Sequence, residues 1–592
     1  NNTKRGRRFE EANRIITTNM LGNKWLGYIV AMFYMIAAGS MYLFPLYSAT
    51  YKELFQVSQN EINFVGTCLN LGTWFAVVPG AIYDKCGPRV SLAIVITALF
   101  LGYFGMGYAG LHPIHDQFHW LYALGFLIGQ SCGLLYITSL VTSLKNLEIV
   151  SKKAVLVGCL VAHFAMSPAF LSQIYLIFFN EDSKPEFLIL LALLLPGAIL
   201  MGLPFFKILP EEKSDLRSYL EEGINKTLKL MILLVFINLT WICIGRIIAD
   251  SLDAQKSTLL VFFISVIVVF AAYFTIPLYF QRNIREFSSN VLSEELEGQG
   301  EIQISTLRQG ENQNGSSPDL ELKTVHMSEW DQNGSEGSQS PPSANNDKSQ
   351  LPALPDNVQG SKSTDYTFLQ ALRSKRFWFL LLPFAIVIGT VICVVNNLGN
   401  LVKSLNNGEE NDSLVTTLVI LSFISNSLGR LSIGTFSDSL QKHISRESML
   451  ILVSSVCLAA QLILIPQNDF NLYVGVSLAG YSFGGYFCLI PTLTSEYFGN
   501  NSMGTIFGAL GMGPSLGSLC FSTIIASQVY EANINTHGNE HTVDDGNDKN
   551  DCVGKNCYRA AFIINAVSCL FAIGSASVLR SLAMKSRQKL QQ

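Results

Sequence analysis

The sequence has little charge: Asp, Glu, Lys and Arg make up 14% of its 592 residues, whereas 49% are hydrophobic. It also lacks a phosphate-binding glycine loop, a metal-ligand spacing and a Ser-His-Asp arrangement. These absences argue against an ATP-driven pump, a metalloenzyme and a hydrolase, so we expect no enzyme activity, no cofactor and no metal ion. The net charge of -4 averages a basic start against an acidic middle, so by itself it says nothing about a nucleic-acid partner, and we expect none.

The hydrophobic residues gather in long blocks. A helix needs about 20 mostly apolar residues to cross about 30 Å of hydrocarbon, and block after block reaches that length. The pattern predicts an all-α integral membrane protein of about 14 spans, arranged as six, two and six. The first block is too long for a signal peptide, so we expect a permanent helix. The expected spans are 25–48, 62–83, 90–111, 120–144, 154–179, 187–206, 230–248, 259–280, 377–402, 414–437, 449–466, 472–492, 505–530 and 560–579.

Composition separates a central segment from the hydrophobic blocks. Residues 281–364 are rich in Ser, Asn, Gln, Glu, Gly and Pro with few aromatic residues, so they cannot bury enough apolar surface to fold. We expect a disordered cytosolic linker, either a solvated tether or a segment regulated by phosphorylation. The expected order is a basic cytosolic amino terminus (1–24), an N-terminal six-helix bundle (25–206), two extra membrane helices (230–280), the linker (281–364), a C-terminal six-helix bundle (365–582) and a cytosolic tail (583–592).

The short loops indicate an orientation, because Lys and Arg concentrate on the cytosolic side of a membrane. These residues occur at the amino terminus, in alternate turns and in the tail, which predicts that both termini are cytosolic. The opposite loops hold a glycosylation acceptor at Asn411 and the pair Cys552 and Cys557, which forms either a disulfide or two free thiols. The membrane is either the plasma membrane or that of the vacuole.

A Gly-x-x-x-Asp pattern recurs at the corresponding helix end of both sets of six. The first copy is Gly80 and Asp84, followed by Arg89, and the second is Gly434 and Asp438. Glycine lets two helices approach closely, and a terminal Asp can pair with a basic residue across a gate and release it again. The repeat predicts a gate at the cytosolic end, although an ordinary turn at the membrane surface would have the same residue types.

Arg430 is a cation inside a hydrophobic block. It lies eight residues before Asp438, which places it about 12 Å along the helix from that end. A charge at that depth is costly and usually faces a cavity or a partner, so we expect Arg430 to bind an anion or to take part in gating. A purely structural ion pair is the alternative. Asn426 lies one turn earlier on the same face.

Other polar residues within the blocks are weaker candidates for a solute path. His163, in the fifth block, can carry protons near neutral pH, but a buried histidine bonded within the helices is more common. Each of the others is more often a contact between helices. These candidates are Asn396, Asn397, Gln130, Asn70 and Tyr34. The thirteenth block is rich in glycine, which predicts either a bendable helix or close packing.

Taken together, these residues resemble the nodulin-like branch of the major facilitator superfamily, which is related to monocarboxylate and oxalate:formate carriers. The resemblance covers nearly the whole chain. It rests on Asn23-Lys24-Trp25-Leu26, Leu43-Phe44-Pro45-Leu46-Tyr47-Ser48, Phe368-Leu369-Gln370-Ala371-Leu372, Asn397-Leu398-Gly399-Asn400, Leu428-Gly429-Arg430, Thr494-Ser495-Glu496-Tyr497-Phe498-Gly499 and the pair Cys552 and Cys557-Tyr558.

The resemblance implies two six-helix bundles around a central site, the extra helix pair and alternating access. Monocarboxylate carriers have a proton-coupling Asp four residues before the buried Arg, where this chain has Asn426. We therefore expect a secondary transporter of a small organic solute, leaning to an organic anion such as a monocarboxylate, with a coupling proton as an optional partner and no required oligomer. The alternative is a receptor or scaffold on the same fold that transports nothing.

Overall fold

The computed structural model describes residues 22–148, 150–180, 183–210, 217–251, 256–283, 365–406, 411–537 and 552–591. Within these ranges the regular structure is helical, with no strand. The linker expected at 281–364 lies outside the described residues from residue 284 onward, as does the amino terminus before residue 22. The prediction of an all-α membrane fold is confirmed.

The first set of helices forms the N-terminal bundle. It begins with a helix at 22–38, which continues through a 3-10 turn into α2. The bounds are η1 Gly39–Leu43, α2 Phe44–Phe55, α3 Gln59–Trp74, α4 Val77–Leu111, α5 Trp120–Asn146, α6 Lys153–Phe178 and α7 Lys184–Gly202. Within this bundle α5 packs on α3 and α4, and α7 packs on α4.

The turn between the second and third spans is hidden inside one continuous run. Thirteen helices in the described residues are long and apolar enough to cross a membrane, and one of them, Glu61–Leu111, has 51 residues. At 1.5 Å per residue that is about 76 Å, more than twice a hydrocarbon core. The backbone of Gly87 has φ 74° inside α4, a left-handed conformation that glycine adopts readily. Two spans therefore meet at Gly87, which gives the expected six, two and six.

The two extra helices form a hairpin beside the N-terminal bundle. They are α8, Arg217–Ser251, and α9, Lys256–Ala272, which is followed by a short helix at 275–283. Both α8 and α9 contact α6, and α8 also contacts α14 of the last set of helices. Aromatic rings join the hairpin to the first helix, with Phe33 lying 5.4 Å from Phe270 between ring centroids.

The last set of helices forms the C-terminal bundle. Its thirteenth span is divided into α17, α18, a π-helical turn and α19. Its glycines pack closely, because a Cβ atom at Gly508 would lie 2.1 Å from the carbonyl oxygen of Ala76. The bounds are α11 Phe368–Arg373, α12 Lys375–Asn396, α13 Leu398–Leu405, α14 Asp412–Ser439, α15 Arg446–Leu464, α16 Asp469–Phe498, α17 Met503–Leu510, α18 Met512–Ser518, η4 Leu519–Ile525, α19 Ala526–His537 and α20 Asn556–Gln591.

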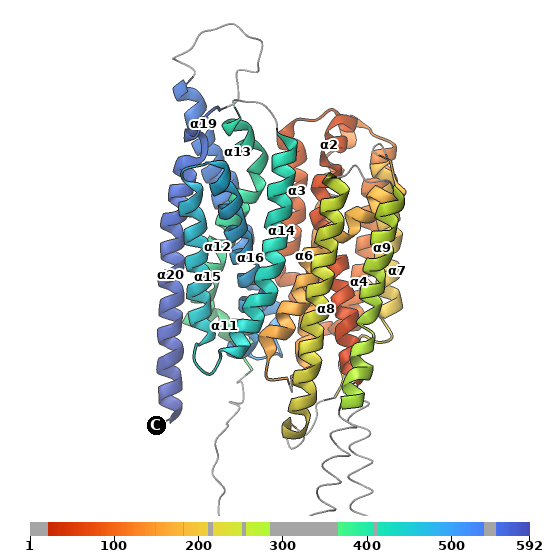
Figure 1. Ribbon diagram of the computed structural model, residues 1–592, viewed down its shortest axis with the longest axis vertical. Helices are drawn as coiled ribbons and strands as arrows, with labels where there is room; N and C mark the ends of the chain where they lie inside the picture. The colour runs from red at the N-terminus through yellow and green to blue at the C-terminus, as the bar shows by residue number, and fades with distance from the viewer. Residues whose placement is uncertain are drawn as a thin grey trace, which may run out of the picture. The chain divides into compact units, whose positions relative to one another are not determined.

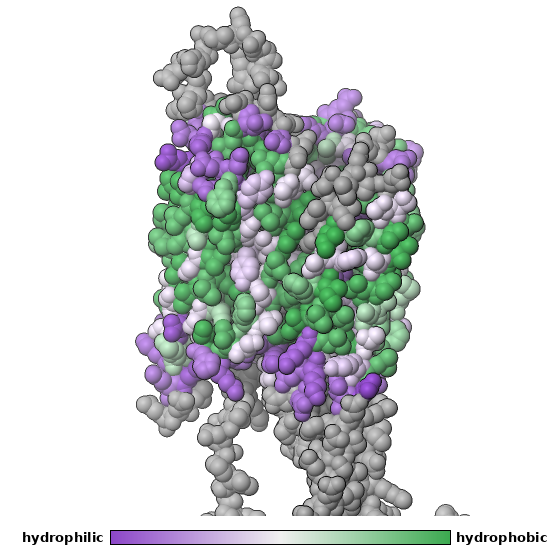
Figure 2. Space-filling view, in the orientation of Figure 1, coloured by the Kyte–Doolittle hydropathy of each residue, from purple (hydrophilic) through white to green (hydrophobic). Residues whose placement is uncertain are grey.

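The outer surface carries a wide apolar belt with polar residues at its two ends (Figure 2). Large apolar side chains are exposed within it, among them Met201 at 76% and Phe571 at 66%. A soluble protein rarely exposes so much continuous apolar surface, whereas a lipid bilayer covers it. The belt places these helices in a membrane.

The two bundles meet mainly through two helix pairs. In one, α4 packs against α17, and in the other, α14 packs against α6. Figure 1 shows α14 running beside α6 where the two sets of helices adjoin. Both pairs bring an Asp-bearing helix end against the first turns of a helix in the opposite bundle, and we call this end of the bundles the aspartate end, after Asp84 and Asp438.

Candidate functional site

The Asp84 contact comprises Gly80, Asp84, Gly504 and Thr505. A Cβ atom added at Gly80 would lie 2.1 Å from the carbonyl oxygen of Gly504, so only glycine allows the backbones of α4 and α17 to lie this close. The close approach brings the carboxylate of Asp84 to the first turn of α17. The sequence pattern predicted a close contact at this point, and the structure has one.

The carboxylate of Asp84 accepts three hydrogen bonds from α17. The backbone N–H groups of Gly504 and Thr505 donate to it over 3.1 and 2.7 Å, and the Thr505 hydroxyl donates over 2.6 Å. The first N–H groups of a helix have no partner within the helix and carry a partial positive charge, which an anion satisfies. The partner across the contact is therefore a helix terminus, where the sequence suggested a basic side chain.

The Asp438 contact is the counterpart in the second half, and comprises Gly434, Asp438, Ala154 and Val155. A Cβ atom at Gly434 would lie 2.5 Å from the carbonyl oxygen of Ala154. The carboxylate of Asp438 accepts a hydrogen bond of 2.7 Å from the backbone N–H of Val155 in the first turn of α6. The two Gly-x-x-x-Asp copies thus make the same kind of contact with opposite bundles.

Asp438 also has a charged partner within its own bundle. Arg446, at the start of α15, places Nη1 2.7 Å from the carboxylate, a contact of opposite charges without hydrogen-bond alignment. The same guanidinium donates from Nε to Glu496 over 2.6 Å and from Nη1 to Ser437 over 2.9 Å. Arg89, the basic residue predicted for the gate, is exposed at the start of the third span.

Arg430 lies at the junction of the two bundles and is fully buried, at 0% exposure. Its Nε donates to the side-chain oxygen of Asn426 over 2.9 Å, and its Nη1 donates to the backbone carbonyl of Val161 on α6 over 2.6 Å. Nη2 is buried without a hydrogen-bond partner. The cation on α14 therefore connects the bundles and keeps one nitrogen available as a donor.

Aromatic rings from both bundles surround this guanidinium. Its central carbon lies 5.6 Å from the ring centroid of Phe164 and 5.1 Å from that of Phe487, within the range of cation–π attraction. The Trp74 ring lies 4.7 Å from that of Phe487 across the bundle junction. Tyr136 packs 5.1 Å from Phe164, and its hydroxyl is buried without a partner. Two unpaired polar atoms thus lie within one aromatic cluster.

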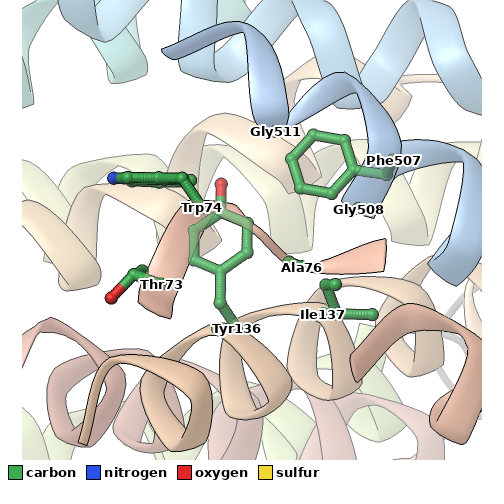
Figure 3. Close-up of a pocket in the computed structure, with 9 residues that line it drawn as sticks. Thr73, Trp74, Ala76, Tyr136, Ile137, Phe507, Gly508 and Gly511 are labelled. Carbon is green, nitrogen blue, oxygen red and sulfur yellow. The ribbon is translucent and has the colours of Figure 1, made fainter. Parts of the chain in front are cut away.

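A small apolar cavity adjoins this cluster. It holds about 10 Å³, close to the space that one water molecule needs. Figure 3 shows the rings of Trp74, Tyr136 and Phe507 around it, with Thr73 and Ile137 below. The lining comes from α3, α5 and Ala76 between α3 and α4 in the N-terminal bundle, and from α17 and Gly511 just after it in the C-terminal bundle. The cavity is therefore bounded by both bundles.

His163 faces away from this cluster. Its Nδ1 lies 2.8 Å from the carbonyl oxygen of Cys159, and because a carbonyl only accepts, Nδ1 carries the proton. Its ring packs 5.4 Å from Tyr273 and 6.2 Å from Phe270 of the hairpin. The structure therefore places His163 between α6 and the hairpin.

The remaining path candidates make contacts within or between helices of one bundle. Gln130 donates to the carbonyls of Gly72 and Phe75, where the chain leaves α3 for α4. The bonds of the others are Tyr34 to the Ile199 carbonyl, Asn70 to the Gly66 carbonyl, Asn397 to the Cys393 carbonyl and Asn396 to the Ser522 hydroxyl. None of these bonds involves Arg430, so of the eight candidates only Arg430 and Asn426 meet.

Two predictions concern loops at the end opposite the aspartate end. Cys552 and Cys557 are joined by a disulfide, and the backbone N–H of Gly554 between them donates to the Ser404 carbonyl over 2.8 Å. Asn411 is exposed at the start of α14, where its side chain accepts a bond from the Leu414 N–H. An exposed position suits a glycosylation acceptor, and the modification itself stays a prediction.

Several residues of the site were not among the sequence candidates. Val155 acts through its backbone N–H, and Thr505 acts through its backbone N–H as well as its hydroxyl. A backbone group leaves no signature in the sequence. Arg446 and Glu496 lie near helix ends, where charged residues are common in any membrane protein, so the sequence does not distinguish them. The rings of Phe164 and Phe487 resemble any of the 38 phenylalanines of the chain. Only their distance from Arg430, known once the bundles are placed, distinguishes them.

Comparisons with known proteins agree with this architecture. A family model described as Nodulin-like matches residues 24–279, and one described as Major Facilitator Superfamily matches residues 330–522. The chain is 23% identical over 526 residues to "Probable transporter MCH1" of Debaryomyces hansenii, covering 86% of this chain and 85% of that protein. It is 25% identical over 238 residues to the protein of the same name from Yarrowia lipolytica, covering 39% of this chain and 47% of that protein.

Two solved structures of lower likeness are also similar to this chain. The fucose:proton symporter FucP of E. coli has 11% identity and a TM-score of 0.42, covering 94% of this chain and 98% of that chain. The proton:xylose symporter XylE has 9% identity and a TM-score of 0.47, covering 94% of each chain.

The helical bundles, the repeated aspartate contacts and the family matches define a class: membrane transporters of the major facilitator type, which are not enzymes. More specifically, the N-terminal part of the chain, residues 24–279, matches the nodulin-like branch of that superfamily. The resemblance stated from the motifs is confirmed at this level.

Proposed function

We propose that this transporter moves a small organic anion across its membrane by alternating access, and that the anion binds at Arg430. The observation that carries the proposal is the guanidinium itself, fully buried between the bundles with Nη2 unpaired. Charged side chains within membrane helices usually mark the route of a substrate or an ion. A carboxylate that accepts from Nη2 would complete the bonding of this cation.

The second part of the proposal is that the Asp84 and Asp438 contacts form the gate at one end. Separation of the bundles would break the bonds of Asp84 to α17 and of Asp438 to α6. It would also part Arg430 from the Val161 carbonyl and leave the cation open to that side. The positions of Lys and Arg in the loops support a cytosolic aspartate end and two cytosolic termini, in the plasma membrane or the vacuolar membrane.

Uptake into sealed proteoliposomes tests the role of Arg430. The panel is labelled monocarboxylates, dicarboxylates, amino acids and vitamins, and the variants are Arg430→Ala and Arg430→Lys. Saturable uptake of an organic anion should be lost in Arg430→Ala, and Arg430→Lys should retain part of it, because an ammonium keeps the charge without the planar fork. Arg580→Ala, which removes an exposed cation from α20, is the matched control. Anion uptake that survives Arg430→Ala would remove this residue from the path.

A thiol buried in the second contact reports on the gate. The Sγ of Cys488 is enclosed where α16 meets α6 and lies 3.3 Å from the carbonyl oxygen of Ala154. An alkylating reagent can reach it only while the aspartate end is open. Site-resolved mass spectrometry should therefore show slow alkylation of Cys488 that changes when a transported anion is added. A rate independent of the anion in an actively transporting sample would contradict this gate.

A further inference from the structure

We propose that this carrier exchanges one organic anion for another rather than taking up an anion together with a proton. The inference rests on the proposed anion site at Arg430 and adds the mode of transport. It follows from the groups that surround the guanidinium, which are all neutral in the part of the chain that the structure describes.

The direct partners of Arg430 are an amide oxygen, a backbone carbonyl and two rings. They belong to Asn426, Val161, Phe164 and Phe487. Farther out, the titratable groups that interact with the cation are phenols and a thiol, and groups of both kinds are ordinarily uncharged near neutral pH. They are Tyr42 in the 3-10 turn, Tyr136 of α5 and Cys488 of α16. The positive charge is thus buried without a carboxylate to balance it.

This imbalance affects the empty and the loaded carrier differently. An isolated buried cation is costly, and an opposite charge in contact with it offsets the cost. Alternating access has to pass through a closed form in which both ends are shut. The loaded carrier reaches that form with Arg430 neutralised by the anion, whereas the empty carrier reaches it with the bare charge. The return of the empty carrier should therefore be the slow step.

A slow empty return favours exchange over net movement. When an anion is present on both sides, the carrier crosses loaded in both directions and avoids the slow step. Proton symport requires a group that gains and loses a proton in step with anion binding, and a carboxylate beside the cation would be the most direct one. The position one turn before Arg430 holds Asn426, whose amide does not titrate, and its oxygen is already used by the Arg430 Nε.

One substitution should convert the mode of transport. Asn426→Asp would place a carboxylate against the Arg430 Nε, where the amide oxygen now lies at 2.9 Å. The empty carrier would then close with a neutral pair, and protonation of the new carboxylate would free the cation for the anion. Net uptake should rise and become dependent on pH. Asn471→Asp, near the start of α16, adds the same charge at another membrane helix and serves as the control.

The experiment compares two preparations of proteoliposomes, with the membrane potential clamped by potassium and valinomycin. One contains buffer and the other unlabelled benzoate, pyruvate or oxalate, and each is given the same labelled anion outside. Exchange into loaded vesicles should exceed net uptake into empty vesicles at least tenfold, and an inward proton gradient should not stimulate wild-type uptake. In Asn426→Asp the ratio should fall by at least threefold and a proton gradient should accelerate uptake, whereas Asn471→Asp should behave as wild type.

Two results would overturn the inference while leaving the proposed function intact. The first is Arg430-dependent net uptake as fast as exchange, and the second is wild-type uptake driven by the proton gradient. If folded protein moves no anion of the wider panel in either preparation, the anion site itself is wrong and the exchange mode falls with it. An unchanged ratio in a folded Asn426→Asp variant would contradict the role assigned to the unbalanced charge.

Discussion

The Asp84 and Asp438 contacts use the same residue pair in the two halves of the molecule but satisfy the aspartate differently. Asp84 accepts three hydrogen bonds, all from neutral groups of α17. Asp438 receives one backbone bond from α6 and shares Arg446 with Glu496 inside its own bundle. The hydrogen bonds of the first aspartate therefore all cross the bundle junction, and its own bundle contributes only a longer-range attraction from Lys145, whereas the second aspartate is in direct contact with a cation of its own bundle.

This difference bears on how the aspartate end would open. If the bundles separate, Asp84 gives up every one of these partners, but the partial charge of a helix terminus is screened and falls off within a turn. Asp438 gives up the Val155 N–H and keeps Arg446. The Asp438 carboxylate therefore keeps a charged partner in both the closed and the open state, so this side of the junction can stay in place during opening. The Asp84 carboxylate has its hydrogen bonds only in the closed state, so this side is expected to separate. The alkylation rate of Cys488 distinguishes the two contacts, because it rises about tenfold for each 1.4 kcal/mol that the closed state loses relative to the open state.

The largest effect is expected from Asp438→Ala. Removing one member of a buried ion network leaves Arg446 with Glu496 alone and leaves the Val155 N–H without its acceptor. Breaking a buried pair in this way costs about 3 to 5 kcal/mol. We expect loss of transport and the largest fall in melting temperature in detergent. Alkylation of Cys488 should rise only about fivefold, through the roughly 1 kcal/mol of the lost Val155 bond, because the Arg446 contact is kept when the bundles separate. A melting temperature that falls less than in Asp84→Ala would show that the internal network contributes little and would contradict the comparison.

The next largest effect is expected from Asp84→Ala. The closed state should lose about 2 kcal/mol of stability, because two helix N–H groups and a hydroxyl lose a charged acceptor. Asp84→Asn keeps an oxygen that can accept and loses the charge, so it should cost about half as much. The melting temperature should change less than in Asp438→Ala, because each bundle keeps its own core. Equal alkylation rates in the Ala and Asn variants would show that the charge has no part in holding α17.

Glycine substitutions test the close approach of the backbones. The Cβ atom of Gly80→Ala would lie 2.1 Å from a backbone oxygen, and that of Gly434→Ala 2.5 Å, so both should push the bundles apart, the first by more. Overpacking of this kind costs about 1 to 3 kcal/mol. Gly197→Ala in α7 is the control, because its Cβ would have no atom within 4 Å. Faster alkylation in the control would mean that added helix propensity, not contact, causes the effect.

The helices and the location of the two contacts could be predicted from the sequence. Spans follow from the length of apolar blocks, and the repeated Gly-x-x-x-Asp marks the two helix ends that meet the other bundle. The orientation of His163 could not be predicted, because α6 is buried on nearly all sides and its apolar residues do not gather on one face of the helix. The same pattern cannot tell a histidine facing the solute path from one facing the hairpin.

Arg430 was found from the sequence because a charge within an apolar block is conspicuous, but its partners were not. The Val161 carbonyl is a backbone group, and Phe164 and Phe487 are apolar residues in apolar helices. Sequence also suggested a basic partner for the aspartates across the contact. The structure has helix termini there because the close approach allowed by Gly80 and Gly434 leaves room for a backbone N–H and not for a long side chain.

The smallest effects are expected from the hydroxyl groups beside the two aspartates. Thr505→Val removes the 2.6 Å bond to Asp84, which still accepts from two N–H groups, and should cost about 1 kcal/mol. Ser437→Ala removes one acceptor from Arg446, which keeps Glu496 and Asp438, and should cost about 0.5 kcal/mol. Thr505→Val should therefore accelerate Cys488 alkylation about fivefold, whereas Ser437→Ala should leave it nearly unchanged, because its bond lies within one bundle and is kept when the bundles separate. If Ser437→Ala accelerates Cys488 alkylation more than Thr505→Val does, the Asp438 contact is the one that separates more easily. The loss of one minor bond would then matter more beside Asp438, where the ionic network with Arg446 is expected to hold the contact.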